Sequence, residues 1–207
     1  MPKLEDLKKE VAKKMEKNDL AHDFEHIMRV YKNAQKIGMK EKVNMKLVLP
    51  AVLLHDIVNY PKTDRRSKSS SLKSSLEAKK ILKRYGYADK EIKIISDAIR
   101  DHSFSRGVTP NTIEGKILQD ADRLDGIGAI GIARTFAVSG TEKRSFYDKS
   151  DPFCKNRQPD DKKWALDHFY RKLLLLEKKM NTKSAKVEAK RRSIIMKKFL
   201  SDFKKEI

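Results

Sequence analysis

Apolar residues recur every three or four positions along nearly the whole chain. Between residues 3 and 17 they fall at Leu4, Leu7, Val11 and Met15, close to the helical period of about 3.6 residues. No stretch of useful length alternates apolar and polar residues as a half-buried strand does. The pattern therefore predicts an all-α protein, with helices at about residues 3–17, 22–37, 44–57, 72–85, 88–101, 112–138 and 161–204.

Glycine, asparagine and proline mark several expected helix ends. Gly38 is expected to stop the second helix and Asn44 to cap the third, in which Pro50 indicates a bend or a late start. The pattern around Gly126 fits one long helix or two, and the last helical stretch is split near Asn181. The polar segment KTDRRSKSSSLKSS is predicted to be a mobile loop, and SFSRGVTPN and EKRSFYDKSDPFCKNRQPDD are further loops.

The composition suits an ordinary globular domain. A chain of 207 residues with 39% apolar residues can bury one core, or one core with an appendage. Its single cysteine excludes an internal disulfide and a thiolate zinc cluster. No apolar run approaches the roughly 20 residues of a membrane span, and the first residues lack the apolar segment of a secretory signal. We expect a cytoplasmic protein with no membrane partner.

The formal net charge of +19 raises the question of a polyanionic partner. The lysines, however, are interleaved with acidic residues, as in KLEDLKKEVAKKMEK, and form no compact basic arm. The aromatic residues do not alternate with basic ones in a base-stacking pattern. Nucleic acid is therefore not the expected partner, and the oligomeric state stays open.

Metal-ligand side chains stand at four helical positions, namely His26, the adjacent His55 and Asp56, and Asp122. The doublet ends the apolar tract LVLPAVLLHD, where a charge without a partner would be costly. Asp122 lies in a second mostly apolar tract, KILQDADRLDGIGAIGIA. One bound cation would satisfy the side chains of the doublet together.

Two histidines and two aspartates offer nitrogen and oxygen ligands. Such a set suits one divalent ion of Mn, Mg, Co, Ni, Fe or Zn, and the spacing does not choose among them. Four or fewer protein ligands leave coordination positions open for water and substrate. An ion in this setting acidifies water and polarises a phosphoryl oxygen, which is the chemistry of hydrolysis.

The order of these motifs resembles a known family. HDFEHIMRV, LLHDIVN and QDADRLD together resemble the HD-domain metal-dependent phosphohydrolase superfamily. The tract IEGKILQDADRLDGIGAIGIARTFAVSG, with the later DPF and DHFYRKLLLLEKKMNT, is similar to its small stand-alone bacterial branch, which includes nucleoside triphosphate pyrophosphohydrolases. The resemblance runs from about residue 20 to about residue 200. It implies one HD-type domain over residues 1–207, a helical bundle with its core at about 20–140 and C-terminal amphipathic helices at about 160–205.

The resemblance also implies roles for individual residues. His26, His55, Asp56 and Asp122 match the family's metal ligands, which hold one divalent ion. His102, in RDHSFSRG, matches a histidine found in many members of this branch and is expected to face the cavity, where it would be catalytic together with Asp56. A structural hydrogen bond is the alternative role for His102.

The general base is left open by the sequence. Some members of the family carry a carboxylate soon after the doublet, whereas here none follows Asp56 until Asp64. The activated water could act alone, or Asp125 or Glu77 could accept its proton. We interpret Asp125 as a catalytic residue that supports the ligands, and His22 as either a supporting residue or a helix cap.

Arginines near the motifs are the expected contacts for substrate phosphates. Arg29 lies three residues after His26, on the same helix face. Arg65 and Arg66 lie in the serine-rich segment, and Arg106 follows His102 in the next loop. Because arginine forms bidentate contacts with phosphate, these four are the predicted substrate-binding residues.

The predicted function is therefore metal-dependent phosphohydrolysis. The substrate is expected to be a small phosphorylated molecule, a nucleotide or a related phosphoester, attacked by a metal-activated water. The resemblance points to a nucleoside triphosphate pyrophosphohydrolase. Two alternatives remain, an HD-type di-iron oxygenase and a non-catalytic basic helical binding protein.

Overall fold

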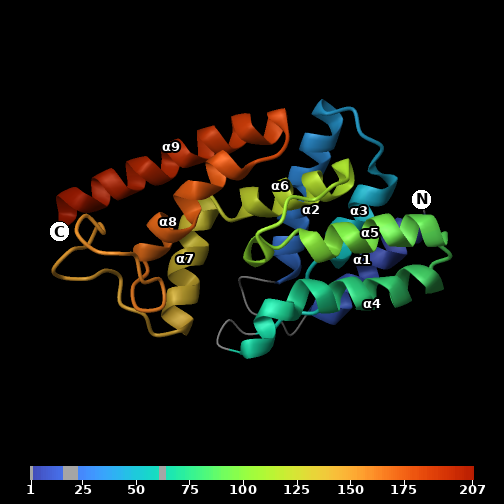
Figure 1. The fold of residues 1–207 in the computed structure, drawn as a ribbon, viewed down its shortest axis with the longest axis horizontal. Coiled ribbons are helices and arrows are strands. Elements are labelled where there is room, and N and C mark those ends of the chain that lie inside the picture. The colour runs from blue at the N-terminus through green and yellow to red at the C-terminus, as the bar shows by residue number, and fades with distance from the viewer. Residues whose placement is uncertain (1, 16–22, 61–63) are drawn as a thin grey trace. The chain divides into compact units, whose positions relative to one another are not determined.

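The computed structural model describes residues 2–15, 23–60 and 64–207, and over these residues the protein is all-α, as predicted (Figure 1). The chain divides into two compact units, Met1–Asp122 and Arg123–Ile207. The first unit contains α1 (Pro2–Met15), α2 (Phe24–Lys40), α3 (Met45–Leu54), η1 (Arg65–Ser69), α4 (Ser70–Arg84), α5 (Asp89–Asp101), η2 (Phe104–Arg106) and most of α6 (Ile113–Asp125). The second contains α7 (Ala129–Thr141), α8 (Asp167–Arg171), η3 (Leu173–Lys179) and α9 (Lys183–Glu206).

Two helices of the first unit begin at side-chain caps. The Asp23 carboxylate accepts from the backbone N–H of His26 at 2.8 Å, and the Asn44 side chain accepts from Lys46 N–H at 3.0 Å. The predicted cap at Asn44 is confirmed. These caps fix where α2 and α3 start, and therefore which residues turn toward the core. Buried apolar residues of the two helices are Ile27, Val30, Ala34, Ile37, Val48, Ala51, Val52, Leu53 and Leu54.

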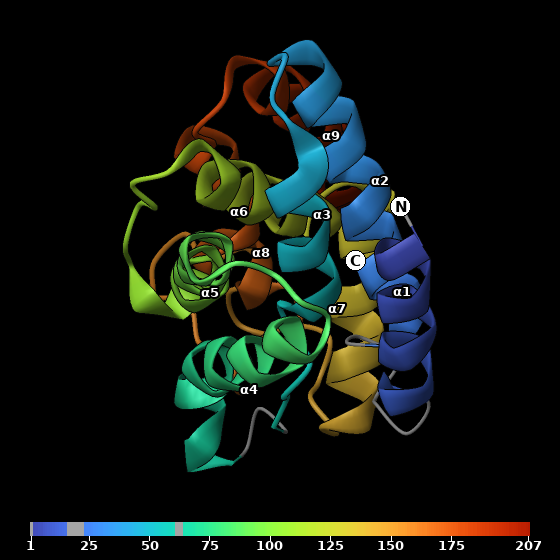
Figure 2. The same cartoon turned by 90° about the vertical axis from the view of Figure 1, so that its right-hand side faces the viewer.

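The serine-rich segment is helical, so the prediction of a loop there was wrong over its described part. Residues 65–69 form η1, and α4 follows directly. The Ser74 hydroxyl donates to the Val58 carbonyl at 3.0 Å, and that of Ser75 donates to the Ser96 carbonyl on α5 at 2.7 Å. Helices α4 and α5 lie side by side in both views (Figures 1 and 2). Buried serines satisfy their own polar atoms this way, and a search for apolar periodicity does not detect such a face.

Gly38 lies inside α2 and does not end it, contrary to the prediction. A Cβ atom at this position would lie 2.1 Å from the Met45 sulfur. The glycine therefore serves the close approach of Met45, at the start of α3, and α2 continues to Lys40. Helix α3 also ends earlier than predicted, at Leu54.

The second unit breaks the helical pattern after α6 and is built around aromatic side chains. Gly128 has a φ of 80°, so the tract around Gly126 forms two helices, the second of the two predicted alternatives. The Phe136 ring of α7 lies 5.9 Å from Phe199 of α9 and 6.4 Å from Phe169 of α8. Before the predicted break near residue 181, the structure has the short α8 and the 3-10 helix η3 in place of one amphipathic α-helix.

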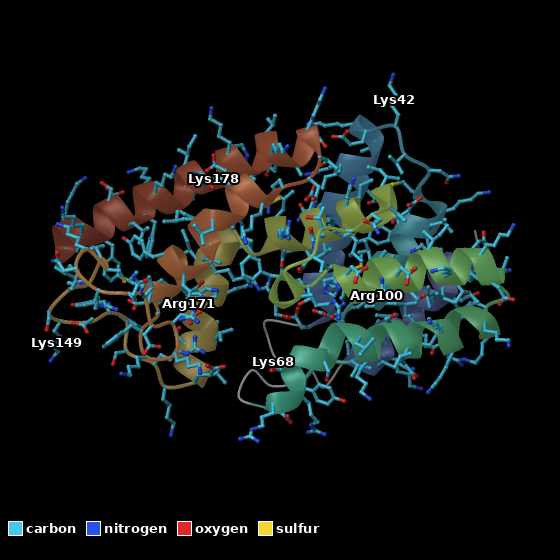
Figure 3. All side chains as sticks on the ribbon, in the orientation of Figure 1. Lys42, Lys68, Arg100, Lys149, Arg171 and Lys178 are labelled. Atoms are coloured by element: carbon cyan, nitrogen blue, oxygen red, sulfur yellow. The ribbon has the colours of Figure 1, made fainter. Side chains whose placement is uncertain are left out.

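Lysine side chains extend from the surface of each unit. Lys42 of the first unit and Lys149 and Lys178 of the second are exposed, and Lys42 extends away from the ribbon in Figure 3. In the part of the chain that the structure describes, no helix combines the length and the apolar character that crossing a bilayer requires.

Candidate metal centre

Four of the predicted site residues come together in the first unit. His26 lies in the first turn of α2, His55 follows the last residue of α3, and Asp122 lies near the end of α6. The two imidazoles are buried, with side-chain exposures of 1% and 0%, whereas Asp56 and Asp122 keep 15% and 27%. The carboxylates therefore form the side of the cluster that solvent reaches.

The ligand atoms of these residues surround a small common volume. His26 Nε2 lies 3.3 Å from His55 Nε2, 3.7 Å from Asp56 Oδ2 and 3.6 Å from Asp122 Oδ1. His55 Nε2 lies 3.7 Å and 3.9 Å from the same two oxygens. Three segments distant in sequence, namely α2, the doublet after α3 and α6, thus bring these nitrogen and oxygen atoms together.

The spacing fits a divalent ion. Four ligands at about 2.1 Å from a central ion lie roughly 3 to 3.4 Å from one another. The observed separations of 3.3–3.9 Å are at or slightly above this range, and they exceed the length of a good hydrogen bond. His26, His55 and Asp56 each place one ligand atom within 4.8 Å of the others, so these three residues fit a metal ion. Asp122 lies beside them, with its Oδ1 3.6 Å and 3.9 Å from the two imidazole nitrogens.

The backbone fixes the orientation and tautomer of His55. Its Nδ1 lies 2.7 Å from the Val52 carbonyl oxygen, and a carbonyl oxygen can only accept a hydrogen bond. Nδ1 is therefore the protonated nitrogen, and Nε2 carries a lone pair. Burial lowers the pKa of His55 to about 4, against the raising effect of the Asp56 charge. A neutral imidazole with Nε2 directed at the cluster is the form that binds a metal.

His102 lies beside the cluster, at the C-terminal end of α5. Its Nδ1 donates to the Ile99 carbonyl at 2.7 Å, so, as at His55, the ring is oriented by the carbonyl three residues earlier. Its Nε2 lies 3.6 Å from Asp56 Oδ1, the carboxylate oxygen that does not face His26. Burial alone would lower the pKa of His102, but the nearby charges of Asp56 and Asp122 raise it above its ordinary value.

The two carboxylates proposed as general bases have other partners. Asp125 lies in the second unit, where its carboxylate accepts from Arg134 at 2.7 Å. Glu77 lies on α4 with the ammonium groups of Lys14 and Lys80 at 3.6 Å and 3.4 Å. Both carboxylates thus form ion pairs that a structural role would explain. The function of either residue as a general base stays a prediction.

The predicted phosphate contacts are distributed around the first unit. Arg29 is half-buried on α2, and Arg65 is exposed on η1. Arg66 donates from Nε to Asp64 Oδ1 at 3.2 Å and from Nη2 to Asp64 Oδ2 at 2.7 Å, and it lies over the Tyr60 ring. Arg106 lies 3.5 Å from Asp101. His22 falls outside the described residues.

Two buried amides near the cluster were missed by the sequence analysis. Asn33 interrupts the apolar face of α2 between Val30 and Ala34, and Gln119 does the same on α6 beside Leu118. A polar residue in a strongly apolar helix face was the available signal, because buried amides need partners.

Comparisons with known proteins agree with this arrangement. Residues 23–127 match the HD domain family model, and an HD domain implies a bound divalent metal ion. The YpgQ protein of Bacillus subtilis (strain 168) is 37% identical over 193 residues, which cover 90% of this chain and 84% of that protein. The solved structure of YpgQ in complex with ADP has a TM-score of 0.76 and 30% identity, and covers 100% of this chain and 95% of that one.

Two further solved structures are similar over nearly their full length. An HD-superfamily hydrolase from Bacillus thuringiensis has a TM-score of 0.77 and 35% identity, covering 99% of this chain and 96% of that one. A protein of Lactobacillus plantarum has a TM-score of 0.80 and 29% identity, with the same coverage of 99% and 96%. From the family match, the identity to these relatives and the shared helical fold, this chain belongs to the HD domain family.

Proposed function

We propose that this protein is a metal-dependent phosphohydrolase that acts on nucleotides or related phosphoesters. The observation that supports it most directly is the four-atom cluster of His26, His55, Asp56 and Asp122, with two imidazoles buried and two carboxylates partly exposed. A cluster closed by protein on one side and open on the other suits an ion that also contacts a substrate.

His26, His55, Asp56 and Asp122 are proposed as the ligands of one divalent ion. When bound, that ion supplies acidification of a water molecule and polarisation of a phosphoryl oxygen. The His55 imidazole would hold its Nε2 lone pair toward the ion, because the Val52 carbonyl accepts the proton of the other ring nitrogen. The carboxylates add two negative charges, which favour a divalent over a monovalent ion.

His102 is proposed as the group that takes up the proton of the attacking water. Its Nε2 carries the lone pair, because Nδ1 is engaged by the Ile99 carbonyl. Asp56, at 3.6 Å, then stabilises the resulting imidazolium. In the reaction the water oxygen forms a bond to phosphorus, the bond from phosphorus to the leaving oxygen breaks, and one proton passes to His102.

A nucleotide substrate is supported by a relative. YpgQ, 37% identical to this chain, has been solved with ADP bound. In this chain Arg29, half-buried one turn after His26, is the proposed phosphate contact closest in sequence to a ligand. Arg65, Arg66 and Arg106 are proposed to contact the outer phosphates, with Arg66 leaving Asp64 to do so. Release of pyrophosphate from a nucleoside triphosphate is the proposed bond cleavage.

The test is hydrolysis by metal-stripped protein reloaded with Mn, Mg, Co, Ni, Fe or Zn. We expect turnover of at least one nucleoside triphosphate in the presence of a divalent ion and none after chelation. Reaction in ¹⁸O-labelled water locates the attacked phosphorus, and label in the nucleoside monophosphate or in pyrophosphate identifies the bond. Full activity after chelation, verified by elemental analysis, would contradict the proposal. Oxygen consumption with iron and no phosphate release would replace it with the oxygenase.

A further inference from the structure

Two buried carboxamides connect the helices that carry the cluster. Asn33 lies on α2 and is 8% exposed, and its Nδ2 donates to the Ala121 carbonyl of α6 at 3.2 Å. Gln119 lies on α6 and is fully buried, and its Nε2 donates to the carbonyls of Asp101 and Val108, each at 3.0 Å. Neither contact is local in sequence.

The position of the Asn33 contact connects it to two proposed ligands. Asn33 is seven residues after His26, two turns along the same face of α2. The carbonyl that it binds belongs to Ala121, whose peptide bond leads directly into Asp122. The hydrogen bond thus joins the helix of the buried imidazole to the residue before the carboxylate, and it opposes sliding of α6 along α2.

Gln119 makes the equivalent connection on the other side of α6. It lies one helical turn before Asp122, and it binds the carbonyl of Asp101, the residue before His102. Its second acceptor, Val108, belongs to the loop after η2, so one amide holds both the end of α5 and the loop that follows it. These contacts fix the end of α5 from which the His102 ring projects.

We propose that Asn33 and Gln119 are positioning residues with separate effects. Asn33 sets the separation of His26 from Asp122 and thereby the affinity for the metal ion. Gln119 sets the position of His102 and thereby the rate of turnover, without affecting the affinity for the ion. The inference rests on the proposed metal centre, and the contacts on which it depends lie within the first unit.

Variants of matched volume separate these roles from a contribution to stability alone. Asn33→Leu and Gln119→Met remove the donors at nearly constant size, and Gln35→Met, at an exposed position of α2, is the control. The Mn²⁺ affinity of the chelator-stripped proteins is measured by competition with a fluorescent chelator. The kcat is measured at saturating Mn²⁺ and nucleotide, and the unfolding midpoint is measured by circular dichroism. The imidazole NMR signals of His102 provide a readout that needs no activity.

For Asn33→Leu we expect Mn²⁺ affinity to fall by about tenfold or more. For Gln119→Met we expect unchanged Mn²⁺ affinity, a kcat lower by about tenfold and displaced His102 signals. Gln35→Met should match the wild type in every measurement. If Asn33→Leu does not fold, Asn33→Ser, whose hydroxyl is too short to reach Ala121, should show the same loss of affinity.

Wild-type affinity and kcat in both variants, with only the unfolding midpoint lowered, would overturn the positioning roles and leave the metal centre intact. A wild-type protein that binds no Mn²⁺ or other divalent ion would overturn the metal centre, and the positioning roles with it. Loss of metal affinity in Gln119→Met equal to that in Asn33→Leu would overturn the division between the two residues.

Discussion

Two regions of this protein gather carboxylates among nitrogen groups, and they differ in how closely the charges approach. In the first unit, Asp56 and Asp122 face the imidazole nitrogens at 3.6–3.9 Å. In the second, Asp167 accepts from the Arg157 guanidinium at 2.5 and 2.8 Å and from the Asp160 N–H at 2.6 Å. The second set is closed by hydrogen bonds, whereas the first keeps the wider spacing of ligands around an ion.

This difference in spacing distinguishes a candidate metal site from a structural ion pair. Burial alone would raise the pKa of Asp167, but its bonds to Arg157 and Asp160 hold that pKa below its usual range. The guanidinium also lies 4.4 Å above the Trp164 ring. The charge of this buried carboxylate is therefore matched within the chain, and the network holds the long loop before α8. The cluster of the first unit combines two carboxylates with two buried imidazoles, and we propose that its cation comes from solution.

The largest expected effect follows from removing one carboxylate of the cluster. Asp56→Asn keeps the size of the side chain and removes its charge, so the affinity for a divalent ion should fall by more than about 100-fold, beyond the usual effect of a supporting residue. Nucleotide hydrolysis should be lost with it. Metal content after dialysis and a chelator competition measure the change.

Asp97→Asn is the matched control, because the Asp97 carboxylate forms ion pairs with Lys93 and Arg100 on the surface of the same helix. It should retain both metal affinity and activity. Full metal occupancy in Asp56→Asn would refute the assignment of this ligand.

Breaking the closed network should change stability and not metal binding. Asp167→Asn removes the buried carboxylate that Arg157 binds directly, and the Asp148 carboxylate stays 3.8 Å from the Arg157 Nε. We expect the free energy of unfolding to fall by about 3 kcal/mol, the lower end for a buried pair, since the Arg157 side chain keeps 21% exposure. Chemical denaturation gives the loss, and a Mn²⁺ titration gives the comparison. Weakened Mn²⁺ binding in a folded Asp167→Asn variant would contradict the distinction between the two regions.

Metal binding should stabilise the protein by mass action. An ion at 100 times its dissociation constant should raise the free energy of unfolding by about 2.7 kcal/mol, since the unfolded chain does not assemble the cluster. Asp167→Asn should gain the same increment from its lower baseline, and Asp56→Asn should gain none. Thermal unfolding with and without Mn²⁺ measures this, and an equal gain in Asp56→Asn would show that the ion acts elsewhere.

The smallest expected effect concerns the carboxylate of Glu188, which is partly exposed and, like Asp167, is bound by arginine side chains. Hydrogen bonds from Arg191 and Arg192, against desolvation, lower the pKa of Glu188 from 4.5 to about 2. A lowered pKa in the folded state means that the stabilisation is complete above 4.5 and disappears as the pH falls through 2. Because a third of the side chain is exposed, we expect only about 1 kcal/mol.

The comparison of Glu188→Gln with the wild type between pH 7 and pH 2 tests this effect. The difference in unfolding free energy should be constant down to about pH 5 and should close below it. A difference that persists unchanged at pH 2 would mean that the effect of the substitution is not electrostatic.

Local chemistry explains which structural predictions succeeded. The helix starting after Asn44 was predictable because one side chain caps it, and the all-α class followed from a periodicity repeated along the chain. The loop prediction failed before residue 72 because the Asp64 carboxylate caps η1 at the Arg66 N–H, and the serines that follow continue directly into α4. Gly38 was assigned to a helix end because the sequence does not reveal the side chain that approaches it.

The sequence by itself determined the residue types available for chemistry. The order of His26, the His55–Asp56 doublet and Asp122 in helical patterns was enough to identify the family resemblance and to propose four ligands. It was not enough to assign Asp125 or the arginines, because the residues that these side chains contact come from other segments of the chain. Asp125, three residues after Asp122, has its carboxylate on Arg134.

Only the tertiary structure decided the spacing of the cluster and the tautomers that serve it. The separations of 3.3–3.9 Å join atoms from α2, α6 and the residues after α3. The protonated nitrogens of His55 and His102 are set by carbonyls three residues earlier, and α6 is held against its neighbours by Asn33 and Gln119. These contacts depend on how helices pack, and packing is a property of distances between segments far apart in the chain, which residue order alone does not contain.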